Sequence, residues 1–239
     1  LVLSSNIIGA IAIMTFVVFF LPMPEISEFI SDTPHLWTYG SLFVLFAVII
    51  GIAVTLRIFR PVLDWQRDPD AHDPNMVRNL VLRIPIYQAG VAAMVWLLGI
   101  LLAVVLASQQ SARLGIVVGV SSTLAGALVV LLTYLQAERL VRPVAAEAVA
   151  RRFEDSTLEP PIKYRLLYTW VMTSGIPLVG IVLVLLGQQE GLFSPDTADI
   201  MPAMIALAVT AVGTGLMGTL FAIMSVVDPI PVSYTHLTL

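Results

Sequence analysis

The chain of 239 residues contains no cysteine, which excludes both a disulfide framework and a thiolate metal site. Charged residues are scarce as well, at 12% of the chain, whereas a soluble domain carries about 25%. In their place, 58% of the residues are hydrophobic, against about 45–50% in soluble domains. This balance excludes a water-soluble globular domain and indicates an integral membrane protein.

The apolar stretches also lack Asp, Glu, Lys, Arg and His in their central parts. Pumps and proton-coupled carriers need such groups inside the membrane to bind and relay charge, so their absence argues against both. The sequence has no phosphate-binding glycine loop, nucleophile elbow, zinc-ligand spacing or basic nucleic-acid patch. We therefore expect no catalytic, metal-binding or cofactor-binding residue in this chain, and no nucleic-acid partner.

One acidic stretch offers carboxylates, which hard cations prefer as ligands. It consists of Asp68, Asp70, His72 and Asp73. Prolines interrupt the stretch, so we interpret it as a solvated turn.

Six hydrophobic runs are each long enough to cross a bilayer as a helix, which takes about 20 apolar residues. They cover residues 1–21, 36–59, 86–107, 114–135, 166–187 and 200–227. A helix satisfies its own backbone hydrogen bonds in lipid, which a single strand cannot do. We predict an all-α polytopic membrane protein whose residues 1–227 form one domain of six transmembrane helices. Helix formers over 135–154 extend the fourth helix beyond the membrane, whereas the segments 22–35 and 60–79 are predicted to be loops.

Basic residues are distributed unevenly between the connecting segments. Eleven of the twelve lie between residues 57 and 83 or between residues 139 and 165. The segments 22–35 and 188–199 carry only acidic charges, and Arg113 alone departs from the pattern. The positive-inside rule then places both termini and both basic segments in the cytoplasm, in a multi-pass protein of the plasma membrane.

Three of the predicted helices end in a similar short motif of a polar residue, proline and an aliphatic residue. The motifs are Arg60-Pro61-Val62, Arg142-Pro143-Val144 and Asp228-Pro229-Ile230. We predict that Arg60, Pro61, Arg142 and Pro143 mark cytoplasmic helix exits. The repeat favours three helical hairpins related by duplication. Chance similarity is the alternative, because arginine is common at cytoplasmic helix ends.

A stripe of small residues runs along the last hydrophobic run. It consists of Ala208, Ala211, Gly215, Gly218, Ala222 and Ser225. Steps of three and four place these residues on one side of a helix, where a second helix can approach closely. We predict that this stripe is the seam of a homodimer, with packing inside one chain as the alternative.

Two other runs carry features of the same kind. Gly115, Gly119, Ser122 and Gly126 form a small-residue face in the fourth run, which suits packing within the chain and between chains equally. Gly175 and Pro177 interrupt the fifth run, where we predict a tolerated kink.

The residues after the last run form a predicted signal connector, Asp228, Pro229 and Ile230. Proline suits the first turn of a helix, so a cytoplasmic helix is expected to begin here, cut short where the sequence stops. Residues 231–239, PVSYTHLTL, depart from the pattern before them and resemble the translation of a sequencing adapter. We expect them to be an artefact without function. The chain begins at Leu1 without methionine, and we expect it to be truncated there as well.

Several single residues and short motifs follow one another in a characteristic order along residues 1–230. They are Leu3, Ser5, Asn6, Gly9, Arg57, Phe59, Arg60, Pro61, Leu82, Arg83, Ile84, Pro85, Arg142, Pro143, Trp170, Ser174, Gly175, Pro177, Gly180, Asp228, Pro229 and Ile230. In their order and spacing they resemble the six-helix membrane anchors of actinobacterial class III adenylate cyclases, in which a HAMP linker joins the anchor to the cyclase domain.

The resemblance implies the membrane anchor, input and dimerisation domain of an enzyme that makes cAMP from ATP with Mg²⁺ or Mn²⁺. Residues 228–230 would begin the HAMP linker, with Pro229 at its opening proline. The sequence has no HAMP body and no cyclase domain, so the catalytic residues of that family have no counterpart here.

Two other functions are open to a chain of this kind, and the stimulus is unknown for all of them. A small-solute transporter or channel would need a polar cavity, for which Gln88, Ser121, Ser122 and Thr123 are the candidate lining residues. The anchor of another HAMP-containing receptor is the second alternative.

Overall fold

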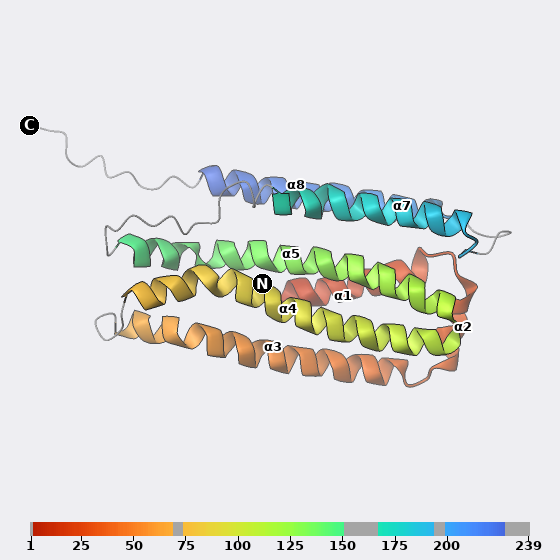
Figure 1. The fold of residues 1–239 in the computed structure, drawn as a ribbon, viewed down its shortest axis with the longest axis horizontal. Coiled ribbons are helices and arrows are strands. Elements are labelled where there is room, and N and C mark those ends of the chain that lie inside the picture. The colour runs from red at the N-terminus through yellow and green to blue at the C-terminus, as the bar shows by residue number, and fades with distance from the viewer. Residues whose placement is uncertain (1, 69–73, 151–166, 194–198, 228–239) are drawn as a thin grey trace, which may run out of the picture.

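The computed structural model describes residues 2–68, 74–150, 167–193 and 199–227, and every regular element in these ranges is a helix. The long helices run side by side along one axis (Figure 1). They are α1 (Val2–Phe19), α3 (Leu36–Arg67), α4 (Pro74–Gln110), α5 (Ala112–Ala150), α7 (Ile176–Gln189) and α8 (Met201–Val227). The described ranges contain no strand, which confirms the all-α class.

Five helical spans are long and apolar enough to cross a membrane. They are Leu36–Arg67, Asn79–Gln110, Ala112–Val141, Leu167–Gln189 and Met201–Leu220. A sixth is obtained if α1 and the short helix α2 (Pro24–Asp32), which meet at a bend of 116°, are counted together. Helices of this length and composition are the signature of a multi-pass membrane protein.

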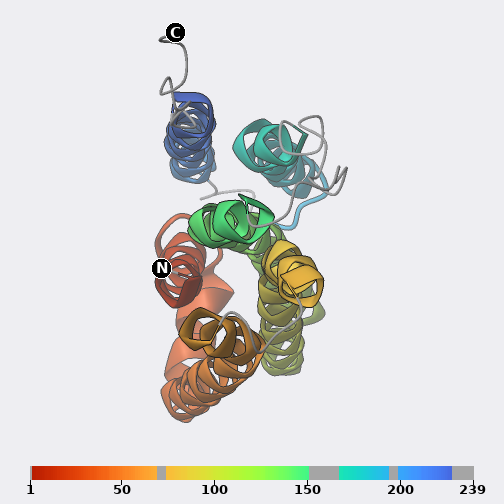
Figure 2. The same ribbon diagram turned by 90° about the vertical axis from the view of Figure 1, so that its left-hand side faces the viewer.

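Each helix has a preferred partner in the bundle. α5 packs extensively against α4 and also against α1, whereas α3 packs against α4. α7 packs against α8, and this pair lies on one side of α5, with α1, α3 and α4 on the other (Figure 2). The predicted pairs α4–α5 and α7–α8 thus lie along each other, whereas α1 and α3 make little mutual contact.

The small-residue face of α5 explains its close approach to α4. A Cβ atom added at Gly119 would lie 2.9 Å from a methyl group of Val104, and one added at Gly126 would lie 3.0 Å from the Trp96 ring. Gly115 faces Ser108 in the same way. Of the two interpretations left open for this face, packing within the chain is therefore correct.

The prediction of an irregular loop over 60–79 is wrong for most of its length. α3 continues through Pro61 to Arg67, and α4 begins at Pro74. Proline inside a helix costs about 3 kcal/mol. A hydrophobic cluster near the end of α3, beyond the predicted run 36–59, offsets this cost, because Trp65 is buried there against α4 and α5. The other buried members of this cluster are Val62, Val81, Ile84 and Val141.

The segment 22–35, also predicted as a loop, contains α2. This helix lies across the end of the bundle (Figure 1), with Pro24 in its first turn and Ile26 buried. Ile26 joins residues of α4, α5 and α8 in a second apolar cluster that closes this end. The predicted extension of α5 is confirmed as far as Ala150.

Candidate functional site: the small-residue face of α8 and the π turn

The part of the α8 stripe around Gly218 packs inside the chain. Gly218 is buried, and a Cβ atom added there would lie 2.8 Å from the methyl group of Thr169 and 2.9 Å from that of Thr173. Met172, which is 1% exposed, lies beside the same position. At Gly218 the contact partner is therefore the preceding helix of the same chain.

The part of the stripe from Ala208 to Gly215 is open. A Cβ atom added at Gly215 would meet nothing within 4 Å, Ala211 is half-buried and Ala208 is exposed. Ala222 and Ser225 belong to α8, but their side chains lie outside the described part of the structure. The stripe thus has two kinds of surface, one used within the chain and one free to meet another helix.

A π turn, η2 (Val171–Gly175), is the element that faces Gly218. The N–H of Ile176 donates to the carbonyl of Val171, five residues earlier, and α7 then begins with Pro177 in its first turn. Proline cannot donate a backbone hydrogen bond, and a π turn rearranges the bonding around it. Gly175 and Pro177 therefore lie where the π turn changes to α7, within one continuous span, and the fold brings this turn against the stripe at Gly218; the kink stays a prediction.

The structure describes the backbone of both predicted helix exits but not the predicted connector. Arg60 and Pro61 lie inside α3, two turns before its end, with Arg60 exposed. Arg142 and Pro143 lie inside the continuous helix α5, but their side chains are outside the described residues. Asp228, Pro229 and Ile230, like residues 231–239, lie beyond the described residues altogether.

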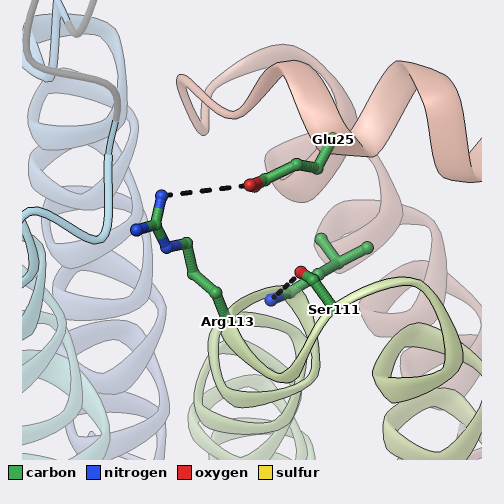
Figure 3. Close-up of polar contacts among 4 residues, drawn as sticks. Glu25, Ser111 and Arg113 are labelled. Carbon is green, nitrogen blue, oxygen red and sulfur yellow. Dashed lines mark hydrogen bonds and ion pairs between the residues drawn. The ribbon is translucent and has the colours of Figure 1, made fainter.

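The one basic residue that departed from the charge pattern has an acidic neighbour. Arg113, at the start of α5, lies 3.9 Å from the Glu25 carboxylate of α2 (Figure 3). Beside it, the Ser111 hydroxyl accepts the N–H of Leu114 at 3.0 Å and caps α5. A partly exposed ion pair contributes at most about 1 kcal/mol, so this contact adds little to the stability of the fold.

A polar cluster that sequence analysis did not identify joins α1 to α4 and α5. The Ser5 hydroxyl donates to Gln136, and the Asn6 amide donates to the Thr133 hydroxyl at 3.4 Å. The Trp96 indole donates to the Asn6 carbonyl oxygen at 3.0 Å. Buried polar groups need partners, so these bonds fix the register of α1 on its neighbours. The sequence signal for this cluster was the pair of polar residues, Ser5 and Asn6, that interrupts the first hydrophobic run.

Among the residues that the structure describes, no three His, Asp or Glu side chains gather where they could hold a metal ion. Asp68 follows the end of α3, whereas Asp70, His72 and Asp73 lie outside the described residues.

Two cavities in the described bundle are overwhelmingly apolar. One, of about 300 Å³, lies between α1, α5, α7 and α8, and the other, of about 440 Å³, lies between α1, α3, α4 and α5. Ser121 lines the first and Gln88 the second, whereas Ser122 and Thr123 line neither. The Thr123 hydroxyl instead bonds the Gly119 carbonyl at 2.7 Å. The polar residues proposed to line a solute path are therefore not assembled in either cavity.

The chain is similar to uncharacterized mycobacterial proteins. It is 29% identical to the uncharacterized protein Rv1319c of Mycobacterium tuberculosis over 183 residues, which are 75% of this chain. It is 28% identical to the uncharacterized protein Rv1318c of the same species over 193 residues, or 77% of this chain. No family model and no solved structure matches the chain. The match covers 34% of each relative, so the chain spans about a third of the length of these curated relatives.

Proposed function

We propose that this chain is the membrane anchor, input and dimerisation domain of a signalling enzyme, an adenylate cyclase that makes cAMP from ATP. The observation that carries the proposal is the divided surface of α8. Gly218 packs against the π turn of the same chain, while Gly215 is open to a partner. A helix built this way can pass a change inside one chain to a second copy.

The arrangement of the chain in the membrane is part of the proposal. Six spans form three hairpins, with both termini in the cytoplasm and the protein in the plasma membrane. The bonds of Ser5 and Asn6 to Gln136 and Thr133 support it, because they place the start of α1 beside the basic end of α5. In this arrangement α2 lies at the outer membrane surface.

The catalytic half lies outside this chain. Each curated relative extends over about three times the matched length, which leaves room for a further domain. Residues 228–230 begin a HAMP-type linker, and the cyclase domain that follows uses Mg²⁺ or Mn²⁺ with ATP. A dimeric anchor raises the effective concentration of two such domains, and a shift of α8 changes their relative geometry.

The two alternative functions make different demands on the cavities and on α8. A small-solute transporter or channel needs a polar path, and the two cavities offer apolar walls instead. The anchor of another HAMP-containing receptor would use α8 in the same way, and only the output domain distinguishes it from a cyclase anchor.

The test uses the full-length gene product in membranes, with cAMP formed from ATP and Mn²⁺ as one readout and dimer crosslinking as the other. Gly215→Ile should lower both, with dimerisation weakened by about 1 kcal/mol or more. Gly213→Ile is the matched control, because a Cβ atom added at Gly213 also meets nothing within 4 Å and Gly213 lies on the other side of α8.

Three results would count against the proposal. Equal effects of the two substitutions would show that the open stripe is not the dimer seam. Full-length protein that dimerises but makes no cAMP would assign the anchor to another receptor. Transport of a solute by the isolated domain would support the carrier instead.

A further inference from the structure

The larger cavity opens sideways between two helices. α1 packs against α5 and α3 packs against α4, so a gap of about 440 Å³ is left between α1 and α3. Ile7, Ile52 and Leu56 line this gap and are themselves exposed, at 40%, 47% and 60%. In a bilayer these side chains face lipid, so a lipid-soluble molecule can enter without crossing water. The volume falls within the range of about 300–1,000 Å³ that is typical of ligand sites.

The cavity is elongated along α4. Along α4 its lining extends from Gln88 to Gly99, which corresponds to about 16 Å of helix rise. Between these ends the walls are mostly apolar, with Val91, Val95 and the Trp96 ring on α4, and Asn6 of α1 adds one polar side chain. On α3, Gly51 keeps the groove wide, since a Cβ atom added there would meet nothing within 4 Å. The shape suits one extended hydrocarbon chain.

One end of the cavity is polar. Gln88 is 3% exposed, and the Thr55 hydroxyl, at 3.2 Å, is its hydrogen-bond partner among the described side chains. A primary amide offers two N–H donors and a carbonyl with two lone pairs. A single hydroxyl uses only part of this capacity, so a buried group at the end of an apolar groove can still both donate and accept.

A carboxylic acid is the head group that complements such an amide. Its carbonyl accepts one amide N–H while its O–H donates to the amide oxygen, and apolar surroundings favour its uncharged form. Arg57 and Arg60 are exposed near the same end of α3 and would attract the carboxylate at the membrane surface before it is buried. We propose that this cavity binds one long-chain fatty acid, with its carboxyl group at Gln88 and Thr55 and its chain directed toward Gly99.

The site does not depend on the proposed function, and its test needs no catalytic readout. The purified chain is placed in phosphatidylcholine nanodiscs with a palmitic acid analogue that carries a mid-chain diazirine, and the crosslinked peptides are mapped by mass spectrometry. Labelling should saturate, fall within residues 44–52 and 91–99, and be competed by palmitic acid but not by its methyl ester.

Substitutions separate the head group from the groove. Gln88→Leu should weaken the apparent affinity roughly tenfold, because two hydrogen bonds are lost. Gly51→Leu should abolish labelling by filling the groove, whereas Gly40→Leu and Gly90→Leu should not, since these glycines are equally open but line no part of the cavity. Thermal unfolding of each variant shows whether a loss of labelling reflects loss of the fold.

The proposal is overturned by any of three results. Equal labelling by a diazirine phosphatidylcholine would show that the groove takes any acyl chain. Equal competition by the methyl ester, or unchanged affinity in folded Gln88→Leu protein, would show that the amide recognises no carboxyl group.

Discussion

At the scale of single residues, Gly218 and Gly215 belong to the same small-residue stripe of α8 but lie at different surfaces, one packed within the chain and one open. Gly215 shares the size of Gly218 and its place in the stripe, yet of these two glycines Gly218 is the one that lies against Thr169 and Thr173. The absence of a side chain is therefore required at Gly218 by the chain itself, whereas at Gly215 it leaves a surface open. A substitution at each position should act on a different property of the protein.

Gly218→Ile should lower the stability of the isolated domain by about 1–3 kcal/mol, the usual cost of overpacking a close contact. Thr173→Ala in the same chain removes the nearest methyl group but one and should restore part of the loss, giving a measurable coupling energy. The measurement is thermal unfolding in detergent. Additive effects of the two substitutions would show that these side chains do not meet.

At the scale of elements, α3 is longer than its apolar run because its end packs as in a soluble protein. Trp65 is 2% exposed among aliphatic residues of α4 and α5, beyond the apolar part of the span. This packing, and not local propensity, carries the helix through Pro61. The cluster thus extends the helical bundle past the hydrophobic run 36–59.

Trp65→Ala should destabilise the domain by about 3–5 kcal/mol, as for large aromatic residues in soluble cores. Pro61→Ala on the same helix should leave the melting temperature unchanged or raise it, because alanine restores a backbone N–H. Trp37→Ala, at the opposite end of α3 where the ring is 62% exposed, is the matched aromatic control. Equal losses at positions 37 and 65 would contradict the role of the cluster.

At the scale of the whole molecule, the charges and the fold agree on which ends lie together. The polar bonds of α1 join its start to the basic end of α5, and the Arg113–Glu25 pair joins the start of α5 to α2. The basic end of α5 therefore lies at the opposite end of the bundle from α2, and the proposed orientation would place the two on opposite sides of the membrane.

Single cysteines test the orientation without background, since the chain contains none of its own. Ser27→Cys on α2 and Gln66→Cys near the end of α3 are both at exposed positions. In intact cells an impermeant thiol reagent should label Ser27→Cys, and Gln66→Cys should react only after the membrane is opened. Labelling of both positions in intact cells would contradict the proposed topology.

The sequence by itself determined the fold class, because its long apolar runs can lie in lipid and satisfy their own backbone hydrogen bonds there as helices. It also located the long spans and the extension of α5. These features depend on local composition and on the chemistry of single residues, which a linear pattern records directly.

Only the tertiary structure decided which helix each small-residue face meets. The spacing of Gly115, Gly119 and Gly126 is compatible with any close partner, and contact with α4 is fixed by how the whole bundle packs. The same holds for Trp65, whose burial carries α3 past Pro61, and for Ile26, whose burial gives the segment 22–35 a helix. Burial depends on neighbours that are distant in sequence, so no local pattern contains it.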